Sequence, residues 1–268
     1  ALDVHMKPFA KVIGADDDVD RLLNRKIGQS VMVTVQPAGG GNPVDEVLTP
    51  VHWLQESTLA YQRWVERRRA EVTRLSGGRI GYLHLSHMDL GSYLKAYSDL
   101  FGQHRHAEAV LVDVRYNGGG NLHDALIAML TGTSHASMVT RDGVRLGTIP
   151  AARWAKPSAV LANAGSYSDG SVFPSLYQRE RIGPLIGERV PGTGTAVIWE
   201  KQIERRLQYG VPQLGFMGND GRWFENQEVV PELAVYNDPA SVAAGRDLQL
   251  EQAVSHLLAR LGPAGAQK

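Results

Sequence analysis

Cysteine is absent from this chain of 268 residues, which excludes disulfides, thiolate metal sites and a cysteine nucleophile. No apolar run approaches the ~18 residues of a membrane-spanning helix, and the amino terminus lacks a signal-peptide pattern. Charge is balanced, with 28 Lys and Arg against 28 Asp and Glu, so we expect no nucleic acid as partner. A hydrophobic content of 43% with 21% charged residues predicts a globular protein with a sizeable core.

Residues 1–52 are predicted to form a small β-rich module. Residues 16–24 carry acidic residues followed by apolar ones at helical spacing, and a glycine then ends the helix. Strands are predicted at 30–35 and 44–51, on either side of a turn rich in glycine and proline. This order resembles the carboxy-terminal half of a PDZ domain, with a generic β appendage as the alternative. Residues 1–14 are too few for a carboxylate-binding loop, so we do not carry over a recognition function.

Residues 53–77 are predicted to be a connecting segment, formed mostly by a long polar helix that glycines end. The main body, residues 78–268, begins with a strand at 81–85. His84 and His87 lie three positions apart there. A strand followed by a loop does not hold two imidazoles at metal spacing, and no nucleotide-binding pattern is present, so we expect no metal and no cofactor.

A glycine-rich turn follows the strand with the strongest buried pattern, Ala109-Val-Leu-Val-Asp-Val114. The turn runs Arg115-Tyr-Asn-Gly-Gly-Gly-Asn121 and leads into a predicted helix at 122–130. Its glycines allow positive φ and bring bare backbone N–H groups beside a helix start. Such groups suit an oxyanion hole or a phosphate cradle, although the phosphate-binding sequence patterns are missing. A turn without any chemistry is the third possibility.

A second corner of this kind is Asn163-Ala-Gly-Ser-Tyr-Ser-Asp-Gly170. It stands between the predicted strand 158–162 and the start of a predicted helix within 171–177. A serine at a strand-to-helix corner exposes its hydroxyl beside the first backbone N–H groups of the helix. The alternative is that Ser166, Ser168 and Asp169 only cap the helix, which is the commonest role of these residue types.

The order of these segments resembles the catalytic core of the tricorn and carboxy-terminal-processing serine peptidases. Two further stretches carry the resemblance, Leu185-Ile-Gly-Glu-Arg-Val-Pro-Gly-Thr-Gly194 and Phe224-Glu-Asn-Gln-Glu-Val-Val-Pro-Glu232. The resemblance covers about residues 78–238. It implies an α/β fold with a crotonase/ClpP-like β-β-α spiral core, preceded here by the partial PDZ-like module. It also implies a mixed sheet rather than a doubly wound one.

The resemblance implies roles for four residues of this chain. Ser168, the serine before Asp-Gly, matches the nucleophile, and Ser166 is the fallback. The N–H groups of Asp169 and Gly120 match the oxyanion hole. Glu225 matches the acidic member of a catalytic tetrad, with a structural salt bridge as its alternative.

The general base separates the two branches of this family. Carboxy-terminal-processing enzymes use a lysine one helical turn after the serine, whereas no lysine occurs here between Lys156 and Lys201. This difference favours the tricorn branch, whose base is a histidine upstream of the PDZ module. We therefore expect the base to lie outside this chain. Weaker candidates within it are His123, His135 and His5.

The leading hypothesis is a tricorn-like serine endopeptidase that cleaves short peptides. The alternatives are a non-catalytic binding or assembly module, a carboxy-terminal-processing peptidase, and a crotonase-like acyl-CoA enzyme. The acidic residue that selects basic substrates in tricorn aligns with Met138, so we do not carry that preference over. The resemblance further implies a homo-oligomer and a cytoplasmic location, with the periplasm left open.

Overall fold

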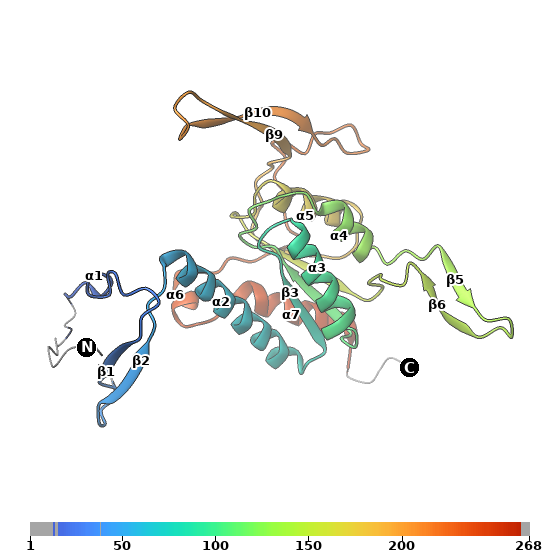
Figure 1. Cartoon of the computed structure of the whole chain (residues 1–268). Helices are drawn as coiled ribbons and strands as arrows, with labels where there is room; N and C mark the ends of the chain where they lie inside the picture. The colour runs from blue at the N-terminus through green and yellow to red at the C-terminus, as the bar shows by residue number, and fades with distance from the viewer. Residues whose placement is uncertain (1–12, 14–15, 38, 264–268) are drawn as a thin grey trace. The chain divides into compact units, whose positions relative to one another are not determined.

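The computed structural model describes residues 13, 16–37 and 39–263 of the chain. The chain divides into two compact units, residues 1–65 and 66–268, and the division falls within helix α2 (Trp53–Ser76) (Figure 1).

The first unit has few buried side chains among its described residues. It contains the short helix α1 (Val19–Leu22), whose first turn is capped by the Asp18 carboxylate. Strands β1 (Val31–Val35) and β2 (Val44–Leu48) pair antiparallel, and every residue of β2 is exposed. The helix and both strands occur in the predicted segments, although the second strand ends at Leu48 rather than at 51, and the PDZ-like interpretation stays a prediction.

The second unit is built on a five-stranded sheet with the order β11-β8-β7-β4-β3. The resemblance implied a mixed sheet, and this prediction is wrong because every pairing within the sheet is parallel. Each of the first three connections carries a helix, as a crossover between parallel strands requires. Antiparallel pairing occurs outside this sheet, in separate hairpins and in the isolated bridges Val190–Val229 and Met217–Trp223. The strands are β3 (Ile80–His84), β4 (Ala109–Asp113), β7 (Ser158–Ala162), β8 (Leu185–Gly187) and β11 (Leu233–Ala234).

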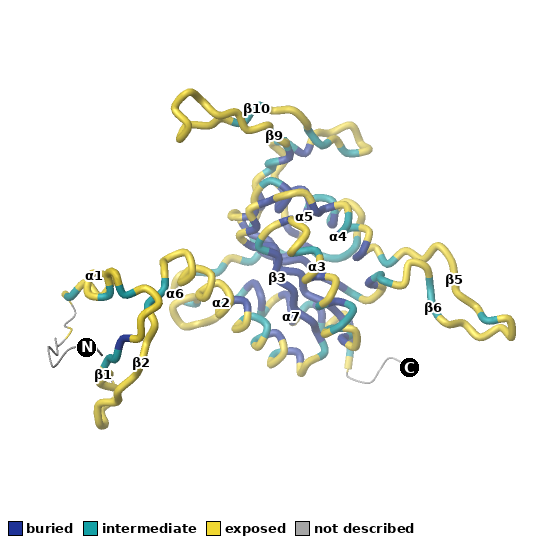
Figure 2. The backbone as a smooth tube through the Cα atoms, viewed as in Figure 1, coloured by how far each residue is buried: buried dark blue, intermediate teal, exposed yellow. Residues whose placement is uncertain are grey.

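Helices cover both faces of this sheet, so its central strands are buried throughout (Figure 2). Val110 and Val112 of β4, and Val114 directly after it, belong to the core shared with the crossover helices. The intervening β4 residues point to the opposite face, where α7 packs against β4, β7 and β8. The helices are α3 (Leu90–Ser98), continued by a π-helix at Asp99–Gln103, then α4 (His123–Leu130), α5 (Asp169–Arg179), α6 (Pro239–Ala243) and α7 (Leu248–Leu261).

Two exposed hairpins extend from the second unit. They are β5 (Ala136–Val139) with β6 (Arg145–Ile149), and β9 (Thr195–Lys201) with β10 (Gln208–Gly215). The β9–β10 hairpin begins directly after the Gly-Thr-Gly stretch that ends at Gly194. No helix in the described part of the chain combines the length and apolarity that crossing a bilayer requires.

Candidate active site

The corner between β7 and α5 holds one serine in an unusual backbone conformation. Ser168 stands immediately before the first residue of α5, with φ 53° and ψ −123°. A residue other than glycine with positive φ costs on the order of 1–3 kcal/mol, and such residues cluster at functional sites. The Ser168 side chain makes no capping bond to the helix. The capping interpretation of this serine is therefore wrong.

Ser166, the fallback nucleophile, is inside the protein. It is fully buried, and its hydroxyl donates to the carbonyl oxygen of Val114 at 2.9 Å. The same hydroxyl oxygen accepts the N–H of Asn163 at 3.4 Å. Ser166 thus ties the corner to the end of β4, while Ser168 stays partly exposed.

The glycine turn after β4 lies directly against this corner. Asn117 stabilises the turn, because its side chain donates to the Leu85 carbonyl at 2.7 Å and accepts the Gly119 N–H at 2.8 Å. Gly119 has φ 92°, and a Cβ there would lie 2.5 Å from the Cβ of Ser168. Only glycine therefore allows this approach.

Two backbone N–H groups at this junction have no acceptor among the described residues, those of Gly120 and Asp169. Gly120 has φ 143°, and a Cβ on it would lie 2.1 Å from the carbonyl oxygen of Met88. Both residues, together with Ser168, line one cavity of about 170 Å³. Unpaired N–H groups beside a serine hydroxyl can stabilise a developing oxyanion.

The rest of this cavity is mostly apolar or uncharged. Its volume is close to that of the ~150 Å³ apolar cavity that binds benzene in an engineered protein. Met138 lies on β5, is 42% exposed and is not part of the cavity lining. The other lining residues are Asn121, Val172, Thr193, Gly194, Thr195, Ala196, Leu214 and Phe216.

Asp169 contributes the one charged side chain of this lining, and that carboxylate is already bonded. It accepts the N–H groups of Leu122 and His123 at 2.6 and 3.2 Å, and it also contacts His123 Nδ1. The hydrogen bond to Asp169 raises the pKa of His123, against the smaller opposing effect of burial. The His123 ring also packs edge-on against Phe216. Asp169 therefore caps α4 rather than its own helix, and it favours the charged form of His123.

Glu225 lies in the segment that connects β10 with β11, and it is partly exposed. One of its carboxylate oxygens accepts the hydroxyl of Thr195 at 2.7 Å. Thr195 lines the same cavity as Ser168. Among the described ion pairs Glu225 has none, so the structural salt bridge is not its role here.

The candidate histidine bases His123 and His135 do not lie together in the structure. His123 is buried beside Asp169, whereas His135 is exposed just before β5. His5 lies outside the described residues. His84 bonds to the Arg115 carbonyl and His87 to the Ser86 hydroxyl. The described residues contain no group of three or more ligating side chains that could hold a metal ion.

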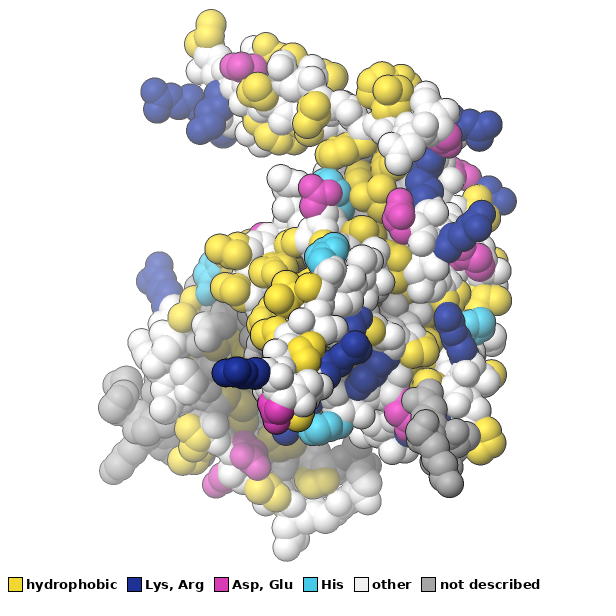
Figure 3. Space-filling model, turned by 90° about the vertical axis from the view of Figure 1, so that its right-hand side faces the viewer, with side chains coloured by type: hydrophobic (Ala, Val, Ile, Leu, Met, Phe, Trp, Pro, Cys, Tyr) yellow, Lys and Arg dark blue, Asp and Glu magenta, His cyan; other side chains and the backbone are white. Residues whose placement is uncertain are grey.

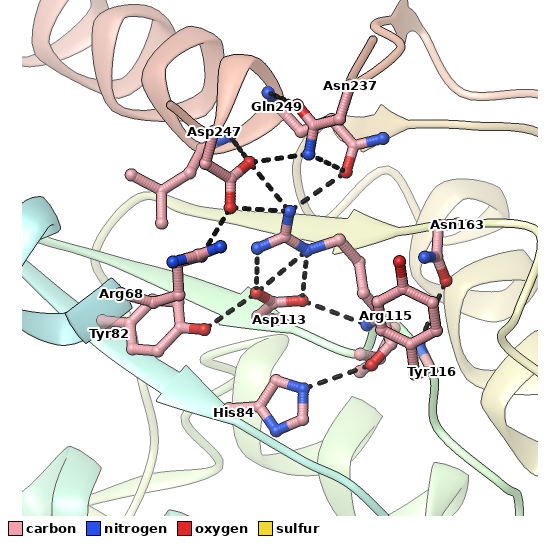
Figure 4. Close-up of polar contacts among 12 residues, drawn as sticks. Arg68, Tyr82, His84, Asp113, Arg115, Tyr116, Asn163, Asn237, Asp247 and Gln249 are labelled. Atoms are coloured by element: carbon pink, nitrogen blue, oxygen red, sulfur yellow. Dashed lines mark hydrogen bonds and ion pairs between the residues drawn. The ribbon is translucent and has the colours of Figure 1, made fainter. Parts of the chain in front are cut away.

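A buried ionic cluster surrounds Arg115, the first residue of the glycine turn, and no local sequence pattern indicates it (Figure 4). The Arg115 guanidinium is 3% exposed and bonds to the carboxylates of Asp113 and Asp247 at 2.6 and 2.9 Å. Arg68 contacts Asp247 at 2.8 Å, which makes the set two cations and two anions. Burial would raise the pKa of Asp247, but the charge and hydrogen bonds of Arg115 outweigh it and lower the pKa. The cluster joins α2, α7 and the end of β4, from which the glycine turn starts.

Comparison with known proteins agrees with this geometry. Residues 79–235, more than half of the chain, match the model of Peptidase family S41. The chain therefore belongs to peptidase family S41. Within this family it is of the tricorn type, as its similarity to tricorn protease relatives and to the tricorn structure shows.

The chain is 32% identical over 241 residues to tricorn protease homolog 1 of Streptomyces coelicolor, covering 90% of this chain and 22% of that protein. It is 27% identical over 256 residues to the tricorn protease of Thermoplasma acidophilum, covering 94% and 23%. The crystal structure of the tricorn protease superimposes with a TM-score of 0.71 at 25% identity, covering 90% of this chain and 23% of that one. A putative peptidase from Parabacteroides merdae shares the fold, with a TM-score of 0.55 at 17% identity and coverage of 90% and 81%. The chain spans under a quarter of the length of the two curated relatives.

Proposed function

We propose that residues 78–268 are the catalytic core of a tricorn-type serine peptidase in which Ser168 is the nucleophile. The observation that carries this proposal is the strained serine at one cavity with two N–H groups that lack acceptors. Attack of the Ser168 hydroxyl oxygen on a peptide carbonyl forms an ester bond to the acyl part of the substrate as the C–N bond breaks, and water then hydrolyses the ester and regenerates Ser168. During this attack, the N–H groups of Asp169 and Gly120 stabilise the negative charge that develops on the carbonyl oxygen.

The proton of Ser168 must pass to a base and then to the leaving amine. Neither of the two described candidates is well placed, because His123 is bonded to Asp169 and His135 is exposed outside the cavity. In the proposal a histidine from sequence outside this chain supplies the base. Glu225 orients that base through the carboxylate oxygen that Thr195 leaves open.

The substrates in this proposal are short peptides with a compact apolar side chain before the cleaved bond. The cavity beside Ser168 presents Val172, Leu214 and Phe216 to that side chain. A cationic side chain would lose its hydration there without a partner, since the Asp169 carboxylate is occupied.

The test is covalent labelling of the full natural protein with a fluorophosphonate, followed by peptide mapping. We expect the label on Ser168 and its loss in Ser168→Ala. Ser166→Ala is the matched control in the same loop, and it should keep the label because its hydroxyl is buried. Absence of labelling in the natural protein would contradict the peptidase and favour a non-catalytic module on the same fold.

We also propose that the protein forms homo-oligomers. Apolar side chains are visible on the β9–β10 hairpin at the top of Figure 3, and Trp199 and Ile203 are 62% and 104% exposed there. Exposed apolar surface of this kind is typical of interaction sites. Sedimentation of the natural protein and of a Trp199→Ser, Ile203→Ser variant tests this. The oligomer of the variant should dissociate into smaller species at a higher protein concentration than that of the natural protein. An identical monomeric mass for both would argue against self-association.

A further inference from the structure

Two hydroxyl groups bond to the backbone of Ser168, one from Ser171 in the first turn of α5 and one from the distant Thr193. The Ser168 N–H donates to Thr193 Oγ1 at 2.8 Å, and the Ser168 carbonyl oxygen accepts the Ser171 hydroxyl at 2.8 Å. The two hydroxyl oxygens, Thr193 Oγ1 and Ser171 Oγ, lie 2.9 Å apart. The three contacts close a ring around the strained residue.

One arrangement of hydrogens satisfies every contact of this ring. Because the Ser168 N–H can only donate, Thr193 Oγ1 accepts it, and the Thr193 hydroxyl is free to donate to Ser171 Oγ. The Ser171 hydroxyl then donates to the Ser168 carbonyl. The Thr193 N–H adds a further bond to Ser171 Oγ at 3.3 Å. Hydrogen bonds that run in one direction strengthen one another.

Thr195, two positions after Thr193, bonds to Glu225, the proposed acidic member of the site. Thr195 donates to Glu225, and both threonines line the cavity beside Ser168. Gly194 lies between them, where a Cβ would come within 2.7 Å of the Phe224 Cβ. The short segment therefore contacts the nucleophile corner and the acidic residue at once. Threonine suits this role because its β-branch restricts χ1 and fixes the hydroxyl.

We infer that Thr193 and Thr195 are positioning residues of this active site: Thr193, with Ser171, keeps Ser168 in its strained conformation, and Thr195 holds the Glu225 carboxylate by a hydrogen bond from the cavity wall. The inference rests on the proposed function, since it assigns a role to groups around the same nucleophile. Neither threonine reacts with substrate. Each acts through the residue that it bonds.

Thr193→Val tests the first half, because valine keeps the shape and removes only the hydroxyl. When full-length protein carries Thr193→Val, we expect its maximal labelling rate with a fluorophosphonate to be about 10- to 100-fold below that of the natural protein. The reason is that the strained Ser168 backbone loses the hydrogen bond that stabilises it. The concentration for half-maximal rate should change less than threefold. Thr193→Ser restores the hydroxyl and should recover most of the rate.

Ser171→Ala and the double variant with Thr193→Val extend the test. Both single changes open the same ring, so the double variant should be no slower than the slower single variant. For Thr195→Val we expect a lower kcat for a peptide with KM within threefold, again recovered by Thr195→Ser. Thermal unfolding of each variant within a few degrees of the natural protein would establish that the fold is kept.

The outcomes separate the inference from the proposed function. If the natural protein labels on Ser168 and Thr193→Val labels at the same rate, the positioning role is refuted while the peptidase stands. Equal losses in Thr193→Ser and Thr193→Val would also refute it, because the hydroxyl would then be irrelevant. If the natural protein itself does not label on Ser168, the proposed function fails first.

Discussion

Replacing Asp247 by asparagine should strongly destabilise the second unit. The carboxylate is 4% exposed, accepts both Arg115 and Arg68, and also bonds to the first turn of α7. Asparagine keeps the shape and the cap but removes the charge. The cluster then has two cations against the single carboxylate of Asp113. A buried guanidinium left in this state is costly because water cannot solvate it.

The size of the effect follows from this burial. Removing one partner of a buried ion pair costs about 3–5 kcal/mol. For a unit of this size, residues 66–268, each kcal/mol lowers Tm by about 2–4 °C. We therefore expect Tm to fall by about 6–20 °C.

Scanning calorimetry of the natural protein and its variants measures this shift. Glu228→Gln is the matched control, because its pair with Arg189 has side chains 60% and 66% exposed and should leave Tm almost unchanged. Adding Arg68→Met to Asp247→Asn restores the charge balance and should recover part of the loss. A Tm for Asp247→Asn within 2 °C of the control would refute the argument from buried charge.

Three further predictions concern the cavity and its surroundings. The pKa of His123 is raised in the folded protein, so its stabilising contribution is complete below its unfolded pKa of about 6.5 and is lost as pH rises through the folded pKa. The difference in urea midpoint between the natural protein and His123→Gln should therefore shrink as pH rises from the unfolded pKa through the folded pKa. A difference that stays constant with pH would contradict this role of His123. Leu214→Asp places a carboxylate in the cavity and should raise cleavage after lysine relative to leucine about tenfold in a peptide library, whereas the uncharged control Leu214→Asn should not. Gly120→Ala places a Cβ against the Met88 carbonyl and should lower the labelling rate about a hundredfold or more, and an unchanged rate would remove Gly120 from the oxyanion hole.

The sequence predicts the buried elements of the second unit well and the exposed ones poorly. The strand 158–162 lies at the predicted bounds, and the helix predicted at 122–130 begins one residue later, because short apolar runs and helical spacing report burial directly. The hairpins β5–β6 and β9–β10 were not predicted. Their strands are mostly exposed, so they lack the alternation of apolar and polar residues that would reveal them.

The candidate site also contains residues that the local sequence indicates and residues that it does not. Ser168 and the glycine turn are evident from local sequence, since each stands at the end of a buried strand. The groups that hold them come from distant positions: Thr193 is 25 residues from Ser168, and Thr195 is 30 residues from Glu225. Arg115 and Asp247 are 132 residues apart. No periodicity or spacing rule connects such pairs, because only the folded sheet brings them together.

Asp169 illustrates why the local pattern was misleading. A Ser-Asp pair before a helix predicts that the carboxylate caps that helix, yet here it binds the first two N–H groups at the start of α4. Because α4 continues from the glycine turn and α5 from the serine corner, this one side chain joins the two loops. Gly120 lies two residues before Leu122, and the other free N–H belongs to Asp169 itself. Together with the bond from the Tyr167 N–H to the Asn117 carbonyl, the carboxylate therefore sets the spacing of the two proposed oxyanion donors.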